Sequence, residues 1–145
     1  MIPYFTKSGE LPRGIYYATW KEFVLRFAFN NDREKQINKL MNGLKVLFEF
    51  GCEEIFIGGS FITSKLKPKD IDVAYNITFL NFKELDKKHP EFFDPNKGKY
   101  LQNKKYGCDF IGYNNYETDI VNFLRYNRNN QPIGILKFYL NEILL

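Results

Sequence analysis

A long amphipathic helix is the feature that most limits how this chain can fold. Apolar residues recur at intervals of three and four between positions 37 and 48, which places them on one face of a helix. They are Ile37, Leu40, Met41, Leu44, Leu47 and Phe48. Asn30, Asn31 and Asp32 are candidates for the N-cap, and Gly51 stands where the end of a helix favours glycine. The pattern predicts a helix over residues 32–50.

Short apolar runs bounded by turn residues predict strands on either side of a turn at Gly59-Ser60 and further along the chain. The predicted strands cover residues 54–58, 71–75, 107–112 and 133–140. Thr19 and Glu22 have the spacing of a capping box, which predicts a short helix that extends as far as Phe29. Helices that alternate with strands in this way predict an α+β fold with a small mixed β-sheet flanked by helices.

The remaining segments are expected to form short helices, turns and loops. Asn81 can cap a short polar helix that stops before Pro90, and a second short helix is expected over 119–126. Residues 90–105 are expected to be a loop with at most a helical turn. The sequence NRNNQP, residues 127–132, has the composition of a turn.

Composition indicates one folded domain. The chain has 145 residues, of which 44% are hydrophobic, so it can bury a sizeable core. We predict a single domain over 1–145, in which 1–16 form an irregular lead-in with several prolines and glycines. No apolar run is long enough for a membrane span, and the first residues lack a secretory signal. We therefore expect a cytoplasmic protein without a membrane partner.

The cysteines and the single histidine do not predict a metal centre. Cys52 and Cys108 each lie beside a predicted strand and are expected to be buried free thiols, with a disulfide as the alternative. Together with His89 they are too few for a zinc site. The net charge of +4 is only a weak indication of polyanionic partners.

Two aspartates at the start of the second predicted strand point to metal-dependent chemistry. Side chains alternate along a strand, so Asp70 and Asp72 share one face while Ile71 and Val73 point into the core. Two carboxylates at this separation can bridge divalent cations. Magnesium prefers such oxygen ligands and is commonly shared between carboxylates and substrate phosphates.

The turn before these aspartates has the composition of a phosphate site. Gly58 and Gly59 let the backbone approach a phosphate with its amide donors unobstructed, and the Ser60 hydroxyl adds a donor. Lys65 is the first of three lysines between the turn and the aspartates, where they can help to neutralise a triphosphate. The other two are Lys67 and Lys69.

Gly59-Ser60 followed by Asp70-Ile71-Asp72 resembles the active-site motif of the DNA polymerase beta-like nucleotidyltransferase superfamily. In that superfamily a helix precedes the first strand, the Gly-Ser turn follows it, and the D-x-D motif opens the second strand. The same order is expected here over 37–76, and the small size resembles the minimal nucleotidyltransferases of toxin–antitoxin pairs. The resemblance implies a nucleotidyltransferase-like palm, two Mg²⁺ ions and a nucleoside triphosphate, with ATP as the first candidate.

The resemblance also implies a third carboxylate on a neighbouring strand, which binds a metal and can deprotonate the attacking hydroxyl. Asp109 is the candidate, because a carboxylate within its short apolar stretch needs a partner. Glu117 and Asp119 are rivals, although both lie where helix N-termini favour acidic residues. Many relatives have an arginine or glycine shortly after the turn. This chain has FITS there, so Thr63 or Lys65 would take over the phosphate contacts.

The sequence therefore predicts transfer of a nucleoside monophosphate from an NTP to a hydroxyl on a protein, an RNA or a small molecule. Gly59 and Ser60 would hold the β- and γ-phosphates. One alternative is an inactive nucleotidyltransferase fold that binds a partner protein, for example as an antitoxin. Another is a small RNA-binding domain that uses tyrosines interleaved with lysines. A plainer interpretation is a hairpin closed by the glycines, with Asp70 capping a turn. The tyrosines and lysines concerned are Tyr100, Tyr106, Tyr113, Tyr116, Lys99, Lys104 and Lys105.

Overall fold

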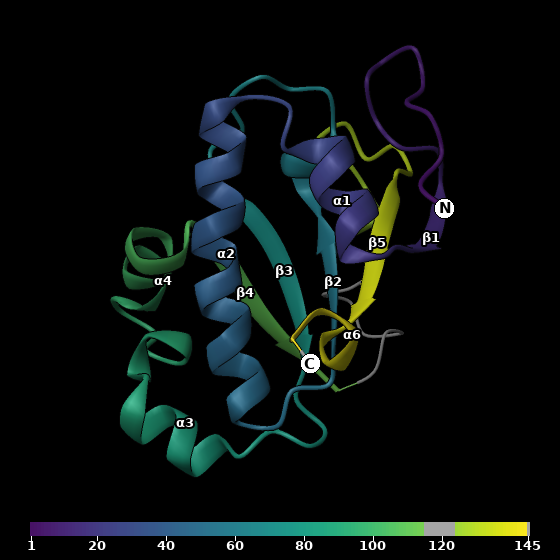
Figure 1. The fold of residues 1–145 in the computed structure, drawn as a ribbon. Coiled ribbons are helices and arrows are strands. Elements are labelled where there is room, and N and C mark those ends of the chain that lie inside the picture. Colours follow the sequence, from purple (N-terminus) through teal and green to yellow (C-terminus); the bar gives the residue numbers. More distant parts are fainter. Residues whose placement is uncertain (115–123, 145) are drawn as a thin grey trace.

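The fold is α+β, as the sequence predicts. The computed structural model describes residues 1–114 and 124–144, in which five strands form one mixed sheet of order β1-β5-β2-β3-β4 (Figure 1). The strands are β1 (Gly14–Tyr17), β2 (Glu54–Gly58), β3 (Ile71–Asn76), β4 (Cys108–Tyr113) and β5 (Gly134–Tyr139). β2 is antiparallel to β3 and β5, whereas β1 pairs with β5, and β4 with β3, in parallel.

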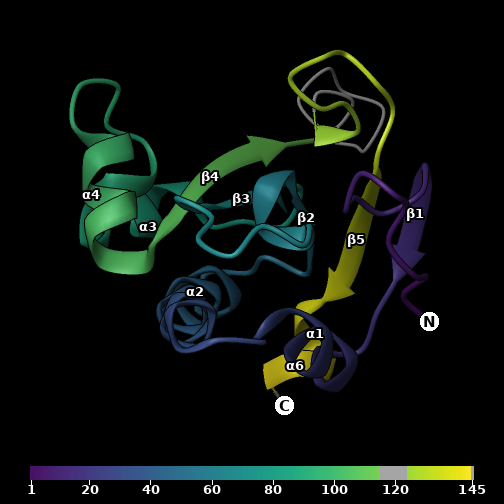
Figure 2. The same ribbon diagram turned by 90° about the horizontal axis from the view of Figure 1, so that it is seen from above.

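Helices cover one face of this sheet and flank its β4 edge. They are α1 (Trp20–Phe27), α2 (Asn31–Glu49), α3 (Phe82–Lys88), α4 (Gly98–Tyr106) and α6 (Leu140–Leu144). Figure 2 shows α1, α2 and α6 on one side of the sheet, with α3 and α4 beside β4. Two 3₁₀ turns, η1 (Gly59–Ile62) and η2 (Pro90–Phe92), follow β2 and α3.

The main core lies between the sheet and the α1–α2 layer. The apolar stripe of α2 that the sequence predicts is buried there, with Leu40, Leu44 and Leu47 fully inaccessible to solvent. Phe23 of α1 packs its ring against four others: Trp20, Phe27, Phe61 and Phe138. Burial of one such side chain contributes about 1.5–3 kcal/mol, so these contacts fix α1 and α2 on the sheet.

The opposite face of the sheet carries a smaller apolar cluster, formed by Phe56, Ala74, Tyr113, Leu124 and Ile135. Ile71 and Val73 of β3 belong to the main core, whereas Ala74 belongs to this smaller cluster. Because side chains alternate along a strand, Asp72 shares the face of Ala74. The acidic motif therefore lies on the face of the sheet that points away from α1 and α2.

The predicted helix signals are confirmed. Thr19 and Glu22 form a capping box, in which Thr19 Oγ1 accepts a hydrogen bond from Glu22 N (3.1 Å) and Glu22 Oε1 accepts one from Thr19 N (3.3 Å). Asn30 is the N-cap of α2, and its Oδ1 accepts a hydrogen bond from Arg33 N (2.9 Å). Gly51 follows the helix with φ 104°, a conformation that favours glycine. The four predicted strands correspond to β2, β3, β4 and β5, within one residue at each end.

Other segments differ from the prediction. Residues 14–16, which the prediction placed in the irregular lead-in, begin the edge strand β1. Four residues among prolines and glycines are too short to show a strand pattern. Residues 98–106 were expected to be mostly loop but form α4, whose buried side chains are Gln102 and Tyr106 rather than an apolar stripe. Leu140 begins α6 instead of ending the last strand.

Three other expectations concern the state of the cysteines, a helix near residue 120 and membrane-spanning helices. Cys52 and Cys108 are buried and free, as expected. The helix predicted over 119–126 falls mainly on 115–123, which lie outside the described residues. Among the helices of the described ranges, none combines the length and the apolarity that crossing a membrane requires.

Candidate functional site

Two of the predicted carboxylates lie side by side on neighbouring strands. The parallel pairing of β3 and β4 puts Asp72 in register with Asp109, so their side chains leave the same face of the sheet at adjacent strands, about 4.8 Å apart. Asp70 lies two residues before Asp72, immediately ahead of β3. The register agrees with the expectation that Asp109 lies on a strand neighbouring that of Asp72.

The glycine–serine turn lies against the same carboxylate from the other side. Gly58 pairs with Asp72 across the antiparallel β2–β3 ladder. Gly59 follows with φ 75°, and a Cβ at this position would collide with Asp72 Oδ2. Only glycine satisfies both the backbone conformation and this close approach. Ser60 is the next residue, in the first turn of η1, so the turn and the acidic motif form one site.

Negative charge accumulates at this site. Burial, followed by the charges of Asp70 and Asp109, raises the pKa of Asp72 to about 7, and the nearby Lys99 opposes the shift only partly. Burial and like charges both disfavour the ionised form of a carboxyl group. A carboxyl group with a pKa perturbed in this way is typical of functional sites. A bound cation would offset the repulsion between these acids and favour the ionised form of Asp72.

Helix α4 contacts the other two acids. Lys99 Nζ lies 3.6 Å from Asp109 Oδ2, and Asn103 Nδ2 donates a long hydrogen bond of 3.4 Å to Asp70 Oδ2. The second oxygen of Asp109, Oδ1, is buried and has no hydrogen-bond partner in the described part of the chain. A buried carboxylate oxygen without a partner is costly, so the site has an unmet requirement for a donor or a cation.

The acids do not form a preassembled metal centre. Within residues 1–114 and 124–144, no three Asp, Glu, His or Cys side chains are grouped as ligands for a metal ion. Asp70 and Asp109 are instead turned to partners on α4. The donor chemistry nonetheless suits Mg²⁺, because all three side chains offer carboxylate oxygens. The rival acids Glu117 and Asp119 lie outside the described residues.

Comparison with known proteins assigns the chain to a family. Residues 3–139 match the family of unknown function DUF6932. The chain belongs to the DUF6932 family. No curated protein and no solved structure matches it. The matched part of this DUF6932 chain includes the Gly-Ser turn and all three aspartates of the site.

The loop after the Gly-Ser turn of this DUF6932 chain is held by a buried arginine. The Arg33 side chain is fully buried and donates hydrogen bonds of 2.6–3.1 Å to four backbone carbonyls. The acceptors are Phe27, Phe61, Thr63 and Lys65. The guanidinium also lies over the rings of Phe29 and Phe61. Burial lowers the pKa of Arg33 to about 10, so it remains protonated at neutral pH.

Arg33 was missed by the sequence interpretation, although one signal was present. It lies four residues before Ile37, so it continues the apolar face of α2. A charged residue at such a position is buried only with many partners. Its contacts give the Gly-Ser turn a rigid support.

The residues proposed for phosphate contacts after the turn have structural contacts of their own. Thr63 Oγ1 donates a hydrogen bond to the Ser60 carbonyl (2.6 Å) and accepts one from the Lys65 amide (3.2 Å). This hydroxyl therefore closes the turn. Lys65 is exposed, and its backbone carbonyl binds Arg33. A phosphate contact from either side chain stays a prediction.

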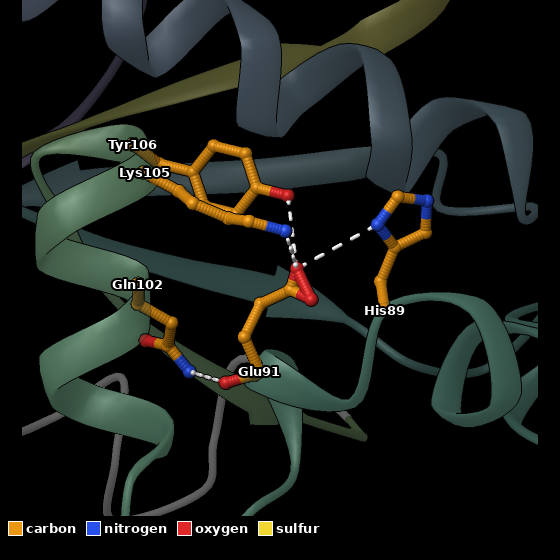
Figure 3. A network of polar contacts seen from close by, with 5 residues as sticks. All are labelled: His89, Glu91, Gln102, Lys105 and Tyr106. Carbon is orange, nitrogen blue, oxygen red and sulfur yellow. Dashed lines mark hydrogen bonds and ion pairs between the residues drawn. The ribbon is translucent and has the colours of Figure 1, made fainter.

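A buried glutamate fixes α4 beside the site (Figure 3). Glu91 Oε2 accepts hydrogen bonds from Lys105 Nζ (3.0 Å) and Tyr106 Oη (3.2 Å), and lies 3.6 Å from His89 Nδ1. Burial would raise the pKa of Glu91. The hydrogen bond from Lys105, with the charges of Lys105 and His89, outweighs burial and holds this pKa below its usual value.

Gln102 links the same helix to β4. Its Nε2 donates to the Glu91 carbonyl (2.9 Å), and its Oε1 accepts from the backbone amide of Phe110 (2.9 Å), the residue after Asp109. Tyr106 is buried, as is Tyr113. Both were counted among the tyrosines of a predicted RNA-binding surface, so that surface loses two of its aromatic side chains.

Proposed function

We propose that this DUF6932 chain is a minimal Mg²⁺-dependent nucleotidyltransferase. It would transfer a nucleoside monophosphate from an NTP, with ATP the first candidate, to a hydroxyl group on a protein, an RNA or a small molecule. The cytoplasm, where NTPs and Mg²⁺ are abundant, is the proposed location. Function as an antitoxin is one setting for such an activity.

The observation that carries the proposal is the convergence of the turn and the acids. Gly59 is packed against Asp72 so closely that no side chain fits between them, and Asp72 is in register with Asp109. This arrangement agrees with the resemblance to DNA polymerase beta-like nucleotidyltransferases. A hairpin with acidic ends does not require Asp72 and Asp109 to share a face, or the turn to press against one of them.

Each residue of the site has a proposed task. The backbone at Gly59 and the Ser60 hydroxyl would hold the β- and γ-phosphates. Asp109 would accept the proton of the acceptor hydroxyl while the hydroxyl oxygen attacks the α-phosphorus in line. The new bond joins that oxygen to the α-phosphorus, the bond to the bridging oxygen breaks, and pyrophosphate leaves. Such catalysis depends mainly on positioning and charge neutralisation.

Asp70, Asp72 and Asp109 would hold two Mg²⁺ ions. When bound, these ions would supply neutralisation of the charge on the attacking and leaving oxygens. The orphaned Oδ1 of Asp109 and the raised pKa of Asp72 fit carboxylates that lack a cation. For the three to converge, Asp70 and Asp109 would turn from Asn103 and Lys99 on α4.

A second candidate function is an inactive fold that binds a partner protein. It is favoured by the contacts of Asp70 and Asp109 with α4, together with the lack of a grouped ligand set in the described residues. In this case Asp70 and Asp109 would have a structural role, through their contacts with α4, and would bind no metal. The two functions differ in whether the protein binds nucleotides at all.

Titration calorimetry with each of the four NTPs, with and without Mg²⁺, tests the proposal. Wild type is compared with Asp70→Asn/Asp72→Asn and with Asp86→Asn, an exposed acid on α3. We expect Mg²⁺-dependent binding by wild type and Asp86→Asn and none by the double variant, with circular dichroism unchanged throughout. A folded wild type that binds no NTP would leave the partner-binding function as the better conclusion.

A further inference from the structure

Helix α4 presents two polar side chains to the acidic site. Lys99 contacts Asp109, and Asn103, one helical turn later, contacts Asp70. Residues four apart lie on one face of a helix, so α4 turns one face toward the carboxylates. Neither residue belongs to the motif that the sequence interpretation identified.

The rest of α4 is anchored, whereas the Lys99 side chain is not. Glu91 holds Lys105 and Tyr106, and Gln102 is bonded to the strand that carries Asp109. The helix axis is thus fixed relative to the acids. The Lys99 side chain is 81% exposed, with one contact to a carboxylate at 3.6 Å. It is therefore an exposed charge on an anchored helix.

We propose, on the basis of the function proposed above, that Lys99 is the resident counter-cation of the metal-free site and a ligand of the substrate triphosphate. Its ammonium group neutralises Asp109 until Mg²⁺ binds. It then leaves Asp109 and contacts the phosphates. Asn103 orients Asp70 in the metal-free site.

The chemistry of lysine suits this exchange of partners. Its charge is compact and sits on a flexible four-carbon stem. An exposed ion pair is weak, so a divalent cation displaces it readily from Asp109. Two Mg²⁺ ions carry only one charge more than three carboxylates, so a bound NTP keeps most of its own negative charge uncompensated. The displaced ammonium then has phosphate oxygens as its nearest anionic partners.

If Lys99 exchanges partners in this way, removing its charge should change the affinities for Mg²⁺ and for a triphosphate in opposite directions. Lys99→Met retains the length of the stem and removes the charge. With MgCl₂ alone we expect this variant to bind the ion about two- to fivefold more tightly, because the competing ammonium is gone. With Mg²⁺ and inorganic tripolyphosphate we expect binding about five- to tenfold weaker, because a phosphate ligand is lost.

Lys104→Met is the matched control, since Lys104 is an exposed lysine on the same helix and the change in net charge is equal. Titration calorimetry of wild type and both variants measures the two affinities. Opposite shifts in Lys99→Met, with Lys104→Met close to wild type, support the proposal. Equal shifts in both variants, or wild-type affinities in Lys99→Met, overturn it and leave the proposed function intact. A folded wild type that binds neither ligand overturns both.

Discussion

The Arg33 guanidinium reaches the carbonyl of Phe61, 28 residues further along the chain, through a hydrogen bond of 2.7 Å between Nη1 and the oxygen. It thereby joins the first turn of α2 to η1, the turn that places Ser60. The same side chain satisfies carbonyls as far as Lys65. One residue outside the motif thus holds the backbone on which the motif depends.

Arg33→Met is expected to lower the free energy of unfolding by about 3 kcal/mol or more, because several buried carbonyls lose their donors. Urea unfolding measures the change. Arg33→Lys should recover only part of the loss, since an ammonium group cannot reproduce the planar fork. The control Arg13→Met, at an exposed position, should remain near wild type. Equal stability of Arg33→Met and Arg13→Met would contradict this account.

Gly59→Ala should be more harmful than Gly107→Ala, although both glycines have positive φ (75° and 64°). At Gly107 a Cβ would make only ordinary contacts with Lys39, whereas at Gly59 it collides with Asp72. We expect a loss of about 1 kcal/mol at position 107 from the backbone conformation. A larger loss, together with loss of Mg²⁺ binding, is expected at position 59. Thermal unfolding and titration calorimetry separate the two effects.

Asp72→Asn should stabilise the metal-free protein at alkaline pH. The pKa of Asp72 is about 7 in the folded state and about 4 in an unfolded chain. The folded protein therefore binds more protons between these values, and wild-type stability falls as pH rises from about 4 to about 7. At pH 8 the variant should gain about 2–4 kcal/mol.

Unfolding curves of both proteins at pH 5 and pH 8 check this dependence. At pH 5, which lies about one unit above the unfolded pKa, the gain of the variant should shrink to about 1 kcal/mol. Mg²⁺ should raise the melting temperature of wild type alone. If Asp72→Asn destabilises the protein equally at both pH values, the cost of ionising Asp72 that we infer from its burial and from the neighbouring acids is wrong.

Glu91→Gln should destabilise the protein in the opposite pH range. The pKa of Glu91 lies below its usual value, so its contribution is complete above the unfolded pKa of about 4.3 and is lost as pH falls. We expect a loss of about 1–3 kcal/mol at pH 7 and a shallower decline of stability below pH 5. Asp86→Asn, at an exposed position on α3, is the control. Faster amide hydrogen exchange confined to α4 would show that Glu91 anchors this helix. An unchanged acid limb would contradict the prediction.

Local patterns predicted most of the fold and the centre of the site. The two-residue period of β3 correctly placed Asp72 apart from Ile71 and Val73, and Gly59-Ser60 correctly predicted a turn directly after β2. Such features depend on neighbours within a few residues. Contacts of Arg33 with carbonyls up to 32 residues away follow no short pattern. Neither do those of Lys99 and Asn103, whose helix has no apolar stripe.

Strand order also constrains how the protein reaches its folded state. β5 lies between β1 and β2. β1 can therefore pair only after β5 is available, because Gly14 is in register with Gly134. β2 and β3 are separated by one short segment and can pair early, whereas β1 closes a loop of more than a hundred residues. Contacts of such long range slow folding. During synthesis, the edge of β2 therefore remains unpaired until the last strand emerges.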